Sequence, residues 1–169
     1  MQQSIENKTD IKNKILNFYN LNKIKIYALV LILLIILISA AYLKYDSKKK
    51  NDLIAEKYIQ AGIYIALNKK DEAKVLYEEI ILTKNKFYSI LSFNTILEKK
   101  LISDKNKILD YFKTLEEIIS NEDQKDLIIF KKALYLIKTS DLEGGKKQLD
   151  KLRKKNSKLK SISDELISK

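Results

Sequence analysis

The sequence predicts an all-α protein in which one transmembrane helix precedes a domain of paired helices. Three observations lead to this prediction. The 169 residues include no proline and only three glycines, and these are the residues that punctuate turns and interrupt helices. Residues 26–43 form an apolar run without a charged side chain. From residue 52 onward, apolar residues recur with the 3.6-residue period of an amphipathic helix.

The apolar run predicts a membrane span. Twelve of its 18 residues are Leu, Ile or Val, and Lys25 and Lys44 bracket it. As a helix it would be about 27 Å long, close to the thickness of the hydrocarbon layer. Tyr27 and Tyr42 fall near its two ends, where amphipathic rings suit the headgroup region. We therefore expect a transmembrane helix over residues 25–45.

A cleaved signal peptide is the main alternative for this segment. The small residues Ser39, Ala40 and Ala41 would suit a signal peptidase, and cleavage after Ala41 would release a soluble secreted protein beginning at Tyr42. However, 25 residues precede the apolar run, which is also longer than the usual 7–15 residues of a signal core. These two features favour an uncleaved anchor.

The segments that flank the anchor do not orient it. Residues 1–24 predict a short polar tail with at most one amphipathic turn, around Ile11, Ile15 and Phe18, and residues 46–51 predict a basic juxtamembrane linker. Because lysines are balanced across the run, the positive-inside rule gives no direction. Five precede it and five follow closely: Lys8, Lys12, Lys14, Lys23 and Lys25, then Lys44, Lys48, Lys49, Lys50 and Lys57.

Residues 52–169 predict a domain of about three helix pairs and a C-terminal helix. Apolar stripes define the pairs as 53–67 with 73–81, 87–101 with 104–119, and 124–139 with 141–153, and a short helix begins near Ser161. Asp71 and Ser103 are candidate N-caps, and Ser140 to Glu143 has the spacing of a capping box.

The pairs recur with the period of tetratricopeptide-type repeats. Comparable positions Ala73, Ile108 and Gly145 are 35 and 37 residues apart. Small residues at such positions let paired helices approach closely, while larger ones fill the groove between neighbours. The middle pair fits only with a longer link, and a plain helical bundle is the alternative. Residues that match the repeat spacing are Ala61, Tyr64, Ala73 and Tyr77 in the first pair, and Ala133, Gly145 and Leu149 in the third.

This layout resembles the YfgM-like ancillary subunits of the bacterial SecYEG translocon. The residues that carry the resemblance run from Tyr58 to Ile81 and continue through Phe87-Tyr88-Ser89-Ile90-Leu91-Ser92. The chain departs from the pattern at Asn68 and Ser140, where repeat glycines often close the first helix. The resemblance implies a single-pass protein of the bacterial inner membrane, with a cytoplasmic N-terminus and a periplasmic repeat domain. It further implies chaperone-like contacts with translocon subunits, periplasmic folding factors or emerging envelope proteins.

Partner-binding residues are expected on the concave face, which the first helix of each pair lines. The alternative for each residue is that it simply fills the core. The expected residues are Tyr58, Gly62 and Ile65 in the first pair, and Phe130, Leu134 and Ile137 in the third.

Other classes of function are disfavoured. Without cysteine or histidine the chain lacks the usual zinc ligands, the thiol nucleophile and the commonest general base, so we expect no catalytic residue, metal or cofactor. The net charge of +11 would suit nucleic acid, but only one of the 33 basic residues is arginine, which makes that partner unlikely. Residues 146–160 carry eight basic side chains and one acid, which predicts a solvated face or contact with anionic lipid or acidic clients.

The sequence therefore predicts a membrane-anchored protein-interaction module, an ancillary factor at the Sec translocon by resemblance. The alternative is a scaffold or assembly factor for another envelope complex that binds no client proteins.

Overall fold

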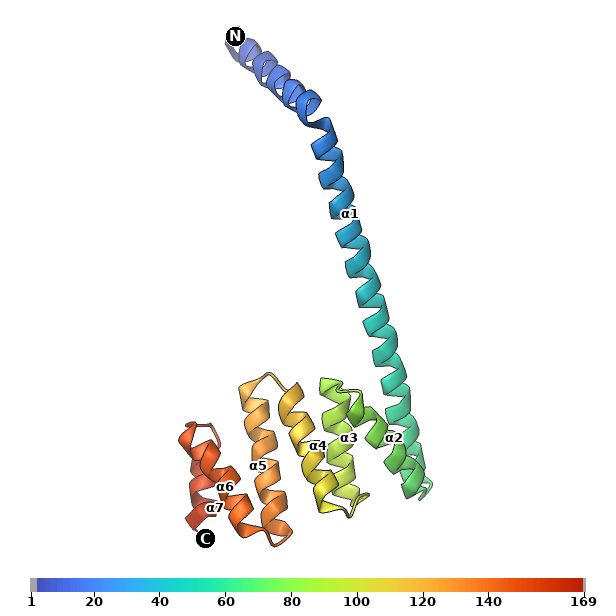
Figure 1. The fold of residues 1–169 in the computed structure, drawn as a ribbon, viewed down its shortest axis with the longest axis vertical. Coiled ribbons are helices and arrows are strands. Elements are labelled where there is room, and N and C mark those ends of the chain that lie inside the picture. Colours follow the sequence, from blue (N-terminus) through green and yellow to red (C-terminus); the bar gives the residue numbers. More distant parts are fainter. Residues whose placement is uncertain (1–2, 169) are drawn as a thin grey trace. The chain divides into compact units, whose positions relative to one another are not determined.

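A computed structural model describes residues 3–168, and the side chains of all of these except 3–12 and 15. The described chain contains seven α-helices and no strand, which confirms the all-α prediction (Figure 1). The helices are α1 (Gln3–Ala66), α2 (Lys70–Leu82), α3 (Lys86–Lys99), α4 (Lys105–Ile118), α5 (Glu122–Lys138), α6 (Leu142–Lys154) and α7 (Lys160–Ser168).

The chain divides into two compact units, residues 1–50 and residues 51–169. The described part of the first unit, residues 3–50, is helical throughout. The tail, for which at most one amphipathic turn was expected, is helical from residue 3 onward, and residues 46–51 are helical as well. The reason is that no glycine or proline occurs before Gly62, so nothing in the local sequence ends the helix.

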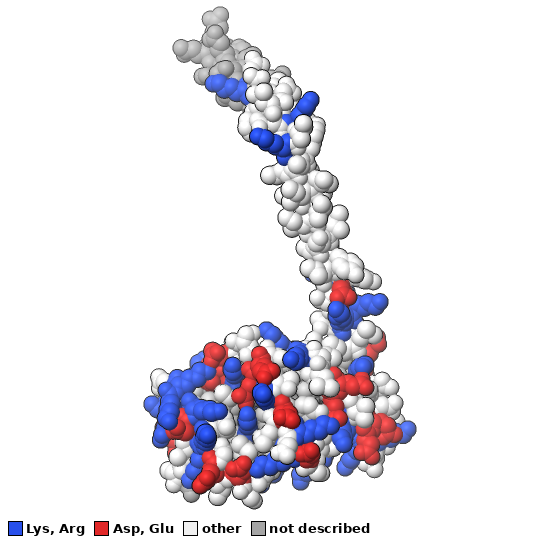
Figure 2. All heavy atoms as spheres, viewed as in Figure 1, with Lys and Arg blue, Asp and Glu red and all other residues white. Residues whose placement is uncertain are grey.

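The apolar segment lies bare within the first unit. Every residue from 27 to 45 is exposed, and Figure 2 shows an uncharged stretch along this part of the helix. An all-round apolar surface of this length is unfavourable in water. By length and composition α1 is a candidate membrane span.

The second unit is a row of helices in chain order, from residues 51–66 of α1 to α7 (Figure 1). From α2 onward each helix packs against the next. The turns alternate between two ends of the row. We call them the Asn51 end, with links 83–85, 119–121 and 155–159, and the Asn68 end, with links 67–69, 100–104 and 139–141.

Each helix pair has two buried core positions that lie twelve residues apart in sequence. In the first pair they are Ala61 and Ala73, both fully buried, and in the third they are Ala133 and Gly145. A Cβ on Gly145 would lie 3.0 Å from the Ala133 carbonyl oxygen, so the backbones of α5 and α6 approach closely. The middle pair has isoleucine at both positions, Ile96 and Ile108, and both are buried.

Aromatic rings fill the core of the middle pair. Phe93 and Phe112 are fully buried, and their ring centroids lie 4.6 Å apart at 82°. The Phe112 ring also lies 5.9 Å from the ring of Tyr135 on α5. These rings, together with the two isoleucines, fill the core between α3 and α4.

Polar side-chain contacts recur along the row at a nearly constant sequence separation. Each joins a residue to one that lies 33 to 37 residues further along the chain. Such a ladder is expected when the same unit is stacked repeatedly. Its members are Asn51–Asn85, Lys86–Ser120, Asn94–Lys131, Lys105–Asp141, Glu122–Lys155 and Asp123–Lys158.

Four helices begin at side-chain caps, and the expected caps were wrong by one or two positions. Asp104 rather than Ser103 caps α4, and Asp141 rather than Ser140 caps α6 through the Gly144 amide. The remaining two caps are Asn85 on α3 and Asn121 on α5.

Asp71 lies inside the first turn of α2. The N-cap position of this helix is Lys69, which makes no capping hydrogen bond. There the negative charge of Asp71 still interacts favourably with the positive end of the helix dipole.

Five helix ends are closed by non-glycine residues in the left-handed conformation. Asn68 and Ser140, where repeat glycines were missing, have φ values of 58° and 64°. The Lys69 amide donates to the Tyr64 carbonyl at 2.8 Å, and the Asp141 amide to the Leu136 carbonyl at 2.9 Å, as in a Schellman motif. The chain thus makes the glycine-type turn without glycine. The other three residues are Lys84, Lys100 and Asn156.

Candidate functional site

A pocket of about 520 Å³ opens at the Asn68 end of the second unit. Pockets of this size hold one small molecule or a few side chains of a partner. Its walls come from the end of α3, the α3–α4 link, α4 and the second half of α5. The lining residues are Ile96, Leu97, Lys100, Ile102, Ser103, Ile108, Lys131, Leu134, Tyr135, Lys138 and Thr139.

The pocket exists because α3 ends early. Helix α1 continues five residues past Ala61, and α5 continues five past Ala133, whereas α3 continues only three past Ile96. Lys100 then turns the chain with a φ of 52°, and five residues rather than three connect the middle pair. The missing half-turn of helix leaves space beside α5.

The floor of the pocket is apolar. Ile96 and Ile108 are buried beneath it, and Leu134 is 40% exposed on its α5 wall. Tyr135 adds a ring whose position is set by Phe112. Burial raises the pKa of the Tyr135 hydroxyl, while Lys105 opposes and Asp104 adds to the shift. The hydroxyl is therefore neutral at physiological pH and can donate a hydrogen bond.

Three lysines line the same pocket. Lys131 Nζ donates to Asn94 Oδ1 at 2.9 Å, whereas the side chains of Lys100 and Lys138 make no hydrogen bond or ion pair with any other described residue. Two uncompensated ammonium groups beside an apolar floor favour a ligand that combines an apolar group with a negative charge. The arrangement is suited to binding.

The six residues expected to bind partners lie in different surroundings. On α1, Tyr58 is half-buried, with its ring 5.6 Å from Tyr77 and 5.8 Å from Tyr88. Ile65 is half-buried against the core, and Gly62 is exposed, so that a Cβ added to it would meet no atom within 4 Å. None of these three lines the pocket.

The three expected residues on α5 also separate. Leu134 lines the pocket, whereas Ile137 packs toward α6, where its Cγ1 atom would lie 2.4 Å from a Cβ on Gly145. Phe130 is half-buried outside the pocket lining. Sequence reasoning missed Lys100 and Lys138. The signal that could have found them is the bulky pair Ile96 and Ile108 at a twelve-residue spacing that elsewhere carries small residues.

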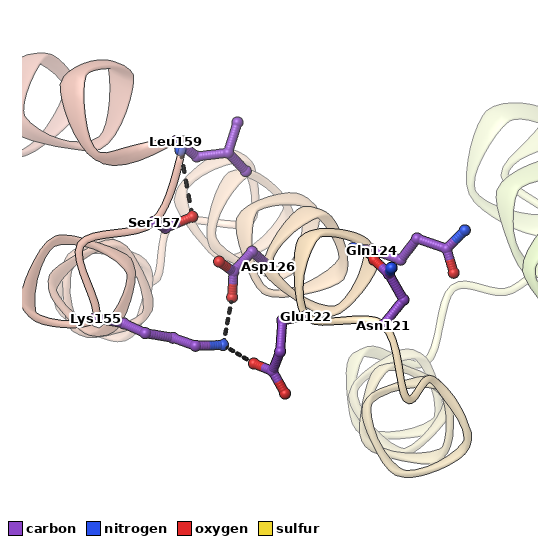
Figure 3. A network of polar contacts seen from close by, with 7 residues as sticks. All are labelled: Asn121, Glu122, Gln124, Asp126, Lys155, Ser157 and Leu159. Carbon is purple, nitrogen blue, oxygen red and sulfur yellow. Dashed lines mark hydrogen bonds and ion pairs between the residues drawn. The ribbon is translucent and has the colours of Figure 1, made fainter.

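The basic segment 146–160 is largely engaged within the fold. Lys155 Nζ donates to Asp126 Oδ1 at 2.9 Å and also contacts Glu122, which ties α6 to α5 (Figure 3). Burial raises the pKa of Asp126, but hydrogen bonds from Ser157 and Lys155 outweigh it, so the pKa lies below its usual value. Basic side chains still gather around α6 and α7, the last two helices of the row (Figure 2).

Comparison with protein-family models, curated proteins and solved structures finds no match to this chain. Among the described residues, no group of three or more His, Cys, Asp and Glu side chains could hold a metal ion. The expectation that the protein binds no cofactor stays a prediction.

Proposed function

We propose that this protein is a membrane-anchored helical-repeat module that binds other proteins. The exposed apolar segment of α1 supports the anchor, since lipid is the solvent that suits such a surface. The ladder of polar contacts along the row supports a tetratricopeptide-like repeat, because stacked copies of one unit repeat their contacts.

The observation that carries the proposal is the lysine-rimmed pocket. An apolar side chain of a partner would enter over Leu134, and carboxylates beside it would meet Lys100 and Lys138. The proposed ligand is therefore a short acidic and apolar segment of a partner protein. The pocket lies at the Asn68 end of the row, opposite the Asn51 end at which the second unit begins.

The narrower proposal follows the family resemblance. In it the N-terminus is cytoplasmic, the repeat domain is periplasmic, and the partners are translocon subunits, periplasmic folding factors or emerging envelope proteins. Protease added to spheroplasts should then cleave the second unit from outside. Protection of that unit would end the translocon proposal.

A scaffold within another envelope complex is the second candidate, and one observation favours it. Ile59 and Ile63 on the first helix of the row, and Leu67 directly after its end, are 63%, 53% and 60% exposed. Their spacing of four residues places them on one side of the helix, a surface suited to a permanent partner. Stoichiometric recovery with one such complex, without translocon subunits, would favour this candidate.

Purification from membranes in mild detergent tests the pocket. The double variant Lys100→Glu/Lys138→Glu should lose its protein partners, because like charges would then face the acidic segment. The matched control Lys113→Glu/Lys147→Glu makes the same charge change at two exposed lysines outside the pocket.

Equal recovery of partners by both double variants would contradict the proposal. Loss of partners from both would assign the effect to overall charge rather than to the pocket, and would contradict it equally.

A further inference from the structure

The link between α2 and α3 carries the most exposed apolar side chains of the second unit. Leu82 is 68% exposed and Phe87 is 64% exposed, and they flank the link at residues 83–85. The Phe87 ring is held in place by the Tyr88 ring, at 5.0 Å and 83°. We call residues 82–87 the 82–87 surface.

Positive charge accompanies these apolar groups. The Lys84 side chain makes no hydrogen bond or ion pair with another described residue, and Lys86 Nζ donates to the neutral Ser120 hydroxyl at 2.7 Å. Both ammonium charges are therefore uncompensated. The acids of the neighbouring turn, Glu122 and Asp123, are each paired with a lysine of the α6–α7 region.

The chain keeps this surface near the anchor. Asn85 Nδ2 donates to Asn51 Oδ1 at 2.7 Å, so the link lies beside the first residue of the second unit. Asn51 comes eight residues after Leu43, the last residue of the apolar run. A fully extended chain of that length spans about 29 Å at most, so Asn51 and the link beside it are tethered within reach of the end of the apolar run.

We propose that the 82–87 surface docks on the anionic surface of the bilayer that holds the anchor. Phe87 and Leu82 would enter the headgroup region, and Lys84 and Lys86 would contact lipid phosphates. The docking rests on the anchoring part of the proposed function but not on the pocket or its partner. It would leave the pocket, at the Asn68 end, facing away from the lipid.

The absence of tryptophan from the chain gives a direct test. Three full-length variants are placed in nanodiscs of brominated phosphatidylcholine, with or without an equal part of phosphatidylglycerol. Ile35→Trp reports the anchor, Phe87→Trp reports the surface, and Leu142→Trp is the control, because Leu142 is 58% exposed and directly follows the link 139–141 at the Asn68 end.

We expect lipid to quench the emission of Ile35→Trp in both discs. It should quench that of Phe87→Trp chiefly in the anionic discs, and leave that of Leu142→Trp unquenched. Adding Lys84→Ser to Phe87→Trp should lower the ratio of docked to undocked protein about fivefold, the effect of one lysine near an anionic surface.

Quenching of Ile35→Trp without quenching of Phe87→Trp would overturn the docking and leave the anchor standing. Absence of quenching in Ile35→Trp would overturn the anchor and the docking together. Equal quenching of Phe87→Trp in both kinds of disc, or of Phe87→Trp and Leu142→Trp alike, would also overturn the proposal.

Discussion

The middle helix pair and the two outer pairs solve the same packing problem differently. The outer pairs have small buried residues at matching positions, Ala61 and Ala73 in the first and Ala133 and Gly145 in the third. The middle pair holds isoleucine at the matching positions and packs through the rings of Phe93 and Phe112. It also ends its first helix earlier and takes a longer link. The difference shows how one helix pair can open a pocket while its two core positions keep the same twelve-residue spacing.

The largest effect is expected from giving the middle pair a small residue. Ile108→Ala should destabilise the protein by about 2–5 kcal/mol, because removing part of a buried side chain leaves a cavity in the core. Urea unfolding of the full chain in detergent measures this. A stabilised variant would show that the middle pair is only a poorly packed outer pair.

The opposite change, enlarging a small residue in the third pair, should lower the stability by a somewhat smaller amount. Gly145→Ala places a Cβ 2.4 Å from Ile137 Cγ1 and should cost about 1–3 kcal/mol of stability. Gly62→Ala is the matched control, since its Cβ meets nothing within 4 Å, and it should stabilise the helix by about 0.5–1 kcal/mol. Equal effects from the two variants would contradict the close approach of α5 and α6.

The ion pair that holds the C-terminal helices should give a pH-dependent effect. The lowered pKa of Asp126 means that its charge stabilises the fold above the unfolded-state pKa, and this contribution is lost as the pH falls through the folded-state pKa. Asp126→Asn should therefore cost about 1–2 kcal/mol at neutral pH, with a difference that shrinks below about pH 4. Glu122→Gln, at an exposed acid on the same lysine, should change stability by less than about 0.5 kcal/mol. Thermal unfolding across pH measures both.

The smallest effect on stability is expected at Lys100 in the middle pair, where stability and partner binding should change in opposite directions. Lys100→Gly should stabilise the fold by about 1 kcal/mol, because glycine adopts the left-handed conformation without steric cost. The same variant removes a lysine of the pocket and should weaken partner capture. Lys99→Gly, one residue earlier and at the last residue of α3, should instead destabilise by up to about 1 kcal/mol. Stronger capture by Lys100→Gly would argue against a role for this lysine.

The positions of the helices could be predicted from the sequence more accurately than their ends. Periodicity located the helix pairs because apolar stripes depend on many residues, such as Ala73, Tyr77 and Ile80 in α2. Each cap depends on one residue, and neighbouring candidates such as Ser103 and Asp104 differ little in preference. The left-handed conformation agrees with the preference of Asn68, whereas at Ser140 it follows from the turn that the packed helices require.

The pocket could not be predicted from the stripes. It depends on where α3 stops, which is determined by the turn at Lys100 and by the hydrogen bond from the Leu101 amide to the Ile96 carbonyl. Leu134 was expected to bind partners and does line the pocket, but Lys100 and Lys138 come from separate parts of the chain and meet only through the tertiary fold. Ile137, equally apolar in sequence, packs toward α6 instead.

Photo-crosslinking in intact membranes tests the binding claim most directly. A photoreactive residue at Leu134 should capture a protein partner, and the capture should disappear in the Lys100→Glu/Lys138→Glu background. The same probe at Leu142, also exposed and outside the pocket lining, should capture none. Equal capture from both positions, or capture at Leu134 that survives the charge reversal, would contradict the account.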